Sequence, residues 1–122
     1  MIVVVLGASH KASRFSNKAV RMLASYGHIV IPVHPKLGEV EGLRVFNSLA
    51  EVEKPVDTVT VYVNPEKSSE MITDILELSP SRVIFNPGSE NQDLINLLEE
   101  NGIHTVSACT LVLLRAGEFE TV

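Results

Sequence analysis

The chain has 122 residues, of which 45% are hydrophobic, and it carries a formal net charge of −5. This length suits one domain with its own core, so we expect a single domain over residues 1–122. The acidic balance and the absence of Trp argue against nucleic acid as a partner. No apolar run reaches the ~20 residues of a membrane span, and no basic region precedes the first apolar run, so we expect a cytoplasmic protein without a membrane partner.

The counts of cysteine and histidine limit the chemistry further. A single cysteine, Cys109, excludes an intrachain disulfide. The four histidines, at positions 10, 28, 34 and 104, lack the spacing of a metal site. We therefore expect neither a disulfide framework nor a bound metal.

The opening residues 2–6 are apolar and mostly β-branched, which predicts a strand buried on both faces. Gly7 then permits a tight turn, and a helical apolar pattern runs from Asn17 to a predicted C-cap at Gly27. A strand, a glycine turn and a helix in this order aim backbone N–H groups and the positive helix end at a phosphate. This loop is predicted to hold the diphosphate of a nucleotide-like ligand.

The rest of the chain continues to alternate strands with helices. Strands are predicted at 28–33, 57–63, 82–85 and 103–106, and helices at 65–78, from Ser89 or Asn91 to Asn101, and at 110–114. Residues 37–56 are predicted to be irregular, apart from a turn of helix at 48–52. This alternation predicts an α/β fold, a three-layer doubly wound Rossmann-like domain with a parallel sheet of about five strands. Ligands bind such sheets outside the carboxyl ends of the strands, where loops 7–16, 34–38, 64–66 and 86–90 converge.

The loop after the second strand bears on the choice of ligand. NAD-binding domains place an acid here to accept from the ribose 2′-hydroxyl, but this chain has no acid between Val33 and Glu39. Lys36 suits a ribose phosphate instead, because it supplies a charge and three donors. Coenzyme A (CoA) carries a 3′-phosphate on this ribose and NADP a 2′-phosphate, so both are candidates. The alternative for Lys36 is a solvated loop lysine.

Short motifs spread over nearly the whole chain resemble a known family. They are VLGAS at 5–9, YGHIVIPVHPK at 26–36, SLAEV at 48–52, NP at 64–65 and PGSEN at 87–91. In this order they resemble the small single-domain CoA-binding proteins, whose fold is similar to the amino-terminal domain of the succinyl-CoA synthetase alpha subunit. Two departures are visible: Lys11-Ala12 stand where members often have a proline, and Cys109 lacks the charged neighbours that many members show.

The resemblance implies a role for each of the four loops. The first would meet the diphosphate, the second the adenosine ribose and its phosphate, and the third would flank the adenine or the pantetheine arm. The fourth would line the floor of the ligand site. The cofactor-binding residues implied in this way are Gly7, Ala8, Ser9, Arg14, Phe15, Ser16, His34, Pro35, Lys36, Asn64, Pro65, Pro87 and Gly88.

No group of residues in the sequence forms a convincing catalytic site, so we expect no catalytic residues. His10 and His34 fall on the ligand side of the sheet, but no acid is placed in sequence to orient either of them. Cys109 is expected to be a packed small side chain, with a reactive thiol or a mixed disulfide with CoA as the alternative hypothesis. Tyr62 and Phe85 are expected in the core.

The leading hypothesis is non-catalytic binding of CoA or an acyl-CoA, as a carrier, a sensor or a partner subunit. An NADP- or NAD-binding oxidoreductase-like protein is the first alternative, and a structural domain that has lost its ligand is the second. The exposed edges of a parallel sheet make a homodimer plausible on general grounds. A partner enzyme subunit is the other candidate partner.

Overall fold

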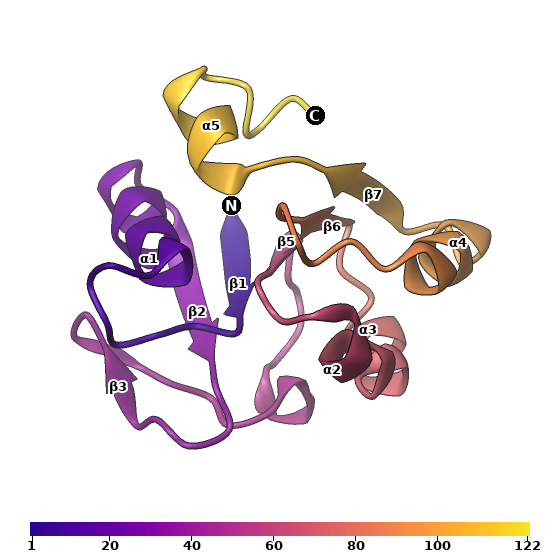
Figure 1. Ribbon diagram of the computed structural model, residues 1–122, viewed down its shortest axis with the longest axis horizontal. Coiled ribbons are helices and arrows are strands. Elements are labelled where there is room, and N and C mark those ends of the chain that lie inside the picture. Colours follow the sequence, from indigo (N-terminus) through magenta and orange to yellow (C-terminus); the bar gives the residue numbers. More distant parts are fainter.

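A computed structural model describes all residues, 1–122, and places five parallel strands in one sheet. The strand order is β2-β1-β5-β6-β7, and helices cover both faces of the sheet (Figure 1). These strands are β1 (Ile2–Leu6), β2 (Ile29–Val33), β5 (Thr58–Val61), β6 (Arg82–Phe85) and β7 (His104–Ser107). The predicted three-layer doubly wound fold is confirmed.

Two hydrophobic clusters, one on each face, hold the layers together. Helices α1 (Phe15–Ser25) and α5 (Thr110–Arg115) pack on one face, over Val3 and Val5 of β1. Helices α3 (Ile72–Leu78) and α4 (Gln92–Glu100) pack on the other face with the short 3₁₀ helix η1 (Leu49–Glu51). Each inner strand is buried on both faces, which explains why its residues are almost all apolar or threonine.

Two predicted segments differ in the structure. The helix predicted over 65–78 is two helices, α2 (Pro65–Ser69) and α3, because the amides of Glu70 and Met71 bond three residues back and tighten the turn. The region predicted as irregular contains a small antiparallel hairpin of β3 (Glu39–Val40) and β4 (Leu43–Arg44). Both turn residues of the hairpin, Glu41 and Gly42, have positive φ angles of 50° and 77°.

The strand order fixes where the loops meet. The chain steps from β1 to β2 on one side and then to β5 on the other, so the order reverses between β1 and β5. In an open α/β sheet the crevice outside the carboxyl ends of these two strands is the usual ligand site. The loops after β1, β2, β5 and β6 all leave the sheet at this edge.

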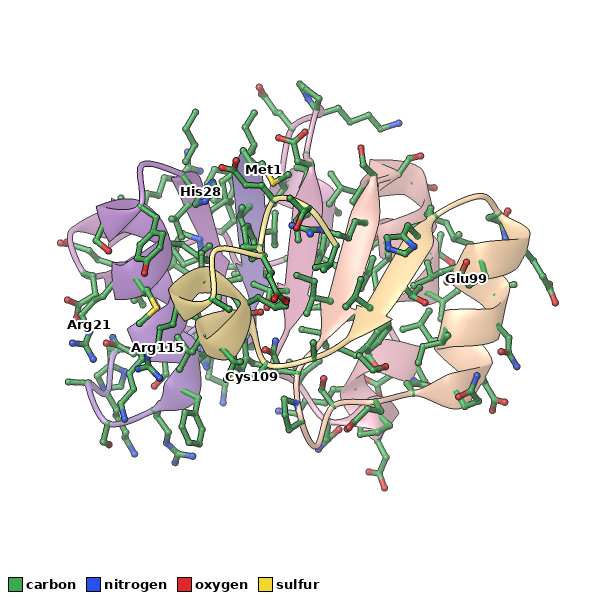
Figure 2. All side chains as sticks on the ribbon, turned by 90° about the horizontal axis from the view of Figure 1, so that it is seen from above. Met1, Arg21, His28, Glu99, Cys109 and Arg115 are labelled. Atoms are coloured by element: carbon green, nitrogen blue, oxygen red, sulfur yellow. The ribbon has the colours of Figure 1, made fainter.

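The end of the chain packs at the opposite, amino edge of the sheet. The buried guanidinium of Arg82 donates through Nη1 to the carbonyls of Phe119 and Val122 at 2.5 and 2.7 Å. His28 lies beside the amino group of Met1, with 3.1 Å between the nitrogen atoms, and Figure 2 shows both residues at this edge. These contacts tie both ends of the chain to the amino edge.

The outer edge of the sheet at β7 is partly covered by a side chain. Glu99 at the end of α4 accepts from both the amide and the hydroxyl of Thr105, at 3.1 and 2.6 Å. Glu99 is exposed, and these two hydrogen bonds hold its carboxylate against β7. No helix of the structure combines the length and apolarity needed to cross a bilayer.

Candidate functional site at the carboxyl edge

Gly7 sets the course of the loop that follows β1. Its φ of +89° suits glycine, and a β-carbon at this position would lie 2.9 Å from Cγ1 of Val63. The amides of Gly7 and Ala8 both donate to the carbonyl of Val33, at 3.0 and 3.1 Å. These two residues therefore shape the loop, whereas the N–H groups free to meet a ligand begin further along.

Two side chains of α1 bind the carbonyls of this loop. Nδ2 of Asn17 donates to the carbonyl of Ser9 at 2.9 Å, and Nη2 of Arg21 donates to that of Ala12 at 2.9 Å. Nε of Arg21 also donates to Oδ1 of Asn17 at 2.8 Å, which links the two side chains. Neither Asn17 nor Arg21 was singled out from the sequence, because a bond to a loop several residues away leaves no local pattern.

Most amides of the same segment have no protein partner, the exceptions being those of Lys11 and Arg14. Arg14 occupies the N-cap of α1 but makes no side-chain cap, so the first turn of the helix is uncapped. The amides that donate to no protein group include those of Ser9, Ala12, Ser13, Phe15 and Ser16. An uncapped helix start with free amides ahead of it is the arrangement that binds phosphate groups.

Arg14, Phe15 and Ser16, which the family resemblance assigns to the cofactor site, lie at the end of this loop. Phe15 is 67% exposed, and Nζ of Lys18 lies 5.3 Å from the centre of its ring. Ser16 is buried in the first turn of α1, and the side chain of Arg14 is exposed. A large exposed aromatic ring beside an anion site offers a surface on which a base could stack.

Hydrogen bonds of His34 and Asn47 order the loop after β2, and the side chain of its lysine makes none. Nδ1 of His34 accepts from the amides of Lys36 and Leu37 at 3.1 and 3.3 Å, while Asn47 donates to the carbonyls of His34 and Leu37. Pro35 and Lys36 are exposed at the tip of this turn. Because Nδ1 accepts these bonds, it carries the lone pair of the neutral ring and Nε2 carries the proton. The lone pair that a general base would use is therefore already engaged.

Positive groups gather around His34. Its partial burial, together with the charges of Lys67, His10 and Lys36, lowers the pKa of His34 below its ordinary value. The structure's one close contact between a basic and an acidic side chain, His28 with Glu120 at 3.7 Å, lies at the amino edge, so these lysines have no carboxylate partner. In a chain of net charge −5, such a cluster favours an anionic ligand at this edge. Lys67 was missed in the sequence because only the fold brings α2 beside the loop after β2.

The loops after β5 and β6 are held in place by the side chains of Asn64 and Asn86. Oδ1 of Asn64 accepts from the amide of Lys67 at 2.9 Å and so caps α2, with Pro65 as its first residue. Asn86 donates to Oγ1 of Thr60 at 2.7 Å and accepts from the amide of Thr110 at 2.9 Å, which ties the end of β6 to β5 and α5.

Pro87 and Gly88 are exposed beyond Asn86. Since β6 is two strands from β1, their loop lies about 10 Å from the first loop. This separation suits a different part of an extended ligand.

Two side chains with chemistry of their own lie near this edge. The hydroxyl of Tyr62 is buried without a hydrogen-bond partner, and burial raises the pKa of Tyr62 to about 12. Cys109 is partly buried against the cluster beneath α1 and α5, as expected of a packed small side chain (Figure 2). Phe85 is fully buried, whereas Tyr62 is only partly so.

Comparison with known proteins identifies the family of the chain. A family model described as "CoA binding domain" matches residues 2–115. The chain is 27% identical to the uncharacterized protein YneT of Bacillus subtilis (strain 168), over 82% of this chain and 74% of that protein. A crystal structure of an uncharacterized protein shares 47% identity over 96% of both chains, with a TM-score of 0.92.

A larger enzyme contains the same fold. The dinucleotide-forming acetyl-coenzyme A synthetase 1 of Ca. Korarchaeum cryptofilum matches with a TM-score of 0.75 and 23% identity, over 88% of this chain but only 25% of that protein. The likeness is one of fold. Nothing in these comparisons supports NADP as the alternative ligand. Because the family model spans nearly the whole chain, the protein belongs to the CoA-binding domain family.

Proposed function

We propose that the protein binds CoA or an acyl-CoA without catalysing a reaction on it, as a cytoplasmic carrier, sensor or partner subunit. The observation that carries this proposal is the segment from Ser9 to Ser16, in which side chains of α1 bind the carbonyls of Ser9 and Ala12 while most amides donate to no protein group. This segment would hold the diphosphate, with the first turn of α1 adding the positive end of the helix dipole.

The cations beside His34 would receive the second anionic part of the ligand. Lys36 is exposed, unpaired and carried by a turn that Asn47 and His34 make rigid. A lysine on an ordered turn in this place supplies charge to the 3′-phosphate of the adenosine ribose. Lys67, from the first turn of α2, would add to the same field.

The proposal of a non-catalytic role rests on the surroundings of the candidate groups. His10 is exposed, and Nδ1 of His34 is engaged by two backbone amides rather than by a carboxylate. A general base is normally oriented by a third group, and neither ring has an acid in that position.

Parallel titrations with CoA, dephospho-CoA, NADP, NAD and ADP test the proposal. At a concentration of ~100 Kd a ligand stabilises the fold by ~2.7 kcal/mol, which raises the Tm by several degrees. We expect this shift with CoA and a smaller one with dephospho-CoA. A shift with NADP and none with CoA would favour the oxidoreductase-like alternative, and no shift with any of them would favour a domain without a ligand.

The variant Lys36→Ala tests whether Lys36 contacts the 3′-phosphate of CoA. This variant should weaken CoA binding about tenfold and leave dephospho-CoA almost unchanged, since the loss is that of one charged contact. Lys54→Ala is the matched control, because Lys54 is exposed and lies beside Leu78 at the other edge of the sheet. Equal losses for both ligands in Lys36→Ala would exclude the 3′-phosphate contact.

A further inference from the structure

In a loop that binds a phosphate through its amides, the carbonyl oxygens must be kept from facing the phosphate. Each residue carries one N–H and one C=O, and a carbonyl that faces the anion would repel it. In the loop after β1, two of these carbonyls, on Ser9 and Ala12, are engaged by side chains from α1. Binding these carbonyls requires particular side chains on α1, in addition to the glycine that the loop requires at position 7.

We propose that Asn17 and Arg21 are positioning residues for the ligand's diphosphate, which they serve by turning the carbonyls of Ser9 and Ala12 away from it. The inference rests on the proposed function and names two residues that the ligand itself does not need to touch. Asn17 lies fully buried in the first turn of α1, and Arg21 lies one turn further along.

The two side chains act as one unit. Arg21 uses Nε to hold Oδ1 of Asn17 at 2.8 Å and Nη2 to hold the carbonyl of Ala12 at 2.9 Å. The contact with Oδ1 fixes the amide of Asn17 in the orientation that presents Nδ2 to the carbonyl of Ser9. A guanidinium makes this forked contact because its donors are planar and rigidly spaced, which a lysine cannot reproduce.

Arg21→Lys is the decisive variant, because Arg21 is exposed and lysine keeps the positive charge. Its binding of CoA and of dephospho-CoA should weaken by the same factor, about tenfold, as one charge-assisted contact is lost. The Tm of the ligand-free protein should stay within a few degrees of that of the wild type. Arg115→Lys is the matched control, because Arg115 lies in the last turn of α5 and is exposed.

The outcomes separate the possible roles. Wild-type affinity in Arg21→Lys, with weak binding in Arg21→Ala, would show that Arg21 contributes only charge and would overturn the inference. A loss of affinity matched by a large fall in Tm would assign Arg21 a purely structural role and would also overturn it. If wild-type protein binds neither CoA nor dephospho-CoA, the proposed function fails first, and this inference fails with it.

Discussion

Gly7 and Val63 approach each other so closely that the first residue tolerates no β-carbon. The added atom would lie 2.9 Å from Cγ1 and 3.2 Å from the amide nitrogen of Val63. This contact joins the end of β1 to the segment after β5, at the point where the strand order reverses. The loops proposed to hold the ligand therefore leave the sheet beside this contact.

Replacing Gly7 by alanine should destabilise the fold. The positive φ and the contact with backbone both oppose the new methyl group, at a combined cost of about 2–4 kcal/mol in the free energy of unfolding. Urea denaturation measures this cost. Gly38→Ala is the control, since a β-carbon on Gly38 meets nothing within 4 Å. Similar stabilities for the two variants would contradict the prediction.

The turn at His34 should make stability depend on pH. Its folded pKa lies below the ordinary 6.5, so the unfolded chain takes up the proton first. The stability from this group is complete above about pH 6.5 and is lost as the pH falls through the folded pKa.

His34→Asn tests this dependence, because an asparagine oxygen can still accept from the turn amides. Its Tm should fall less than that of the wild type between about pH 7.5 and pH 5. His28, whose pKa is also lowered, mainly by burial, contributes equally to both proteins. Parallel pH profiles for the two proteins would show that His34 does not contribute.

Loss of the Asn86 side chain should weaken the whole carboxyl edge. Asn86→Ala leaves the amide of Thr110 and the hydroxyl of Thr60 short of a buried partner. The expected cost is about 2–3 kcal/mol of unfolding free energy, measured in urea. Asn96→Ala, on the exposed face of α4, is the matched control and should cost less than about 0.5 kcal/mol.

The acid at the hairpin turn should oppose binding of an anion. Oε2 of Glu41 accepts from Nδ2 of Asn17 at 3.2 Å, which places a negative charge beside the first turn of α1. Glu41→Gln keeps an acceptor but removes the charge, and should tighten CoA binding about two- to fivefold at low salt. Calorimetric titration measures the change, with Glu100→Gln at the far end of α4 as the control. Unchanged or weaker binding in Glu41→Gln would show that this charge does not reach the ligand.

Local signals in the sequence were enough to predict the scaffold of the site. The apolar run before Gly7 predicts a buried strand and a turn, and Asn91 caps α4 as one of the two predicted residues. Such features depend on neighbours within a few positions. The doubly wound order then follows from the alternation of strands and helices.

The contacts that tune the site could not be predicted in this way. The amides of Gly7 and Ala8 are taken by Val33, on the neighbouring strand, and Asn86 reaches Thr110 across 24 positions. Lys67 joins the cations near His34 only after α2 folds back over the sheet. These partners are set by packing between elements, and no short motif records them.

The bond between Glu99 and Thr105 has a consequence for how this protein avoids unwanted association. An outward-pointing amide on an edge strand is a template on which another chain can add a strand, and here that amide is already occupied. Hydrogen bonds from the hydroxyl and amide of Thr105 lower the pKa of Glu99, so its carboxylate remains charged in mildly acidic solution. A second copy that docks along β7 would have to displace a carboxylate from its two donors. Strand addition at Thr105 would therefore cost the edge these two hydrogen bonds.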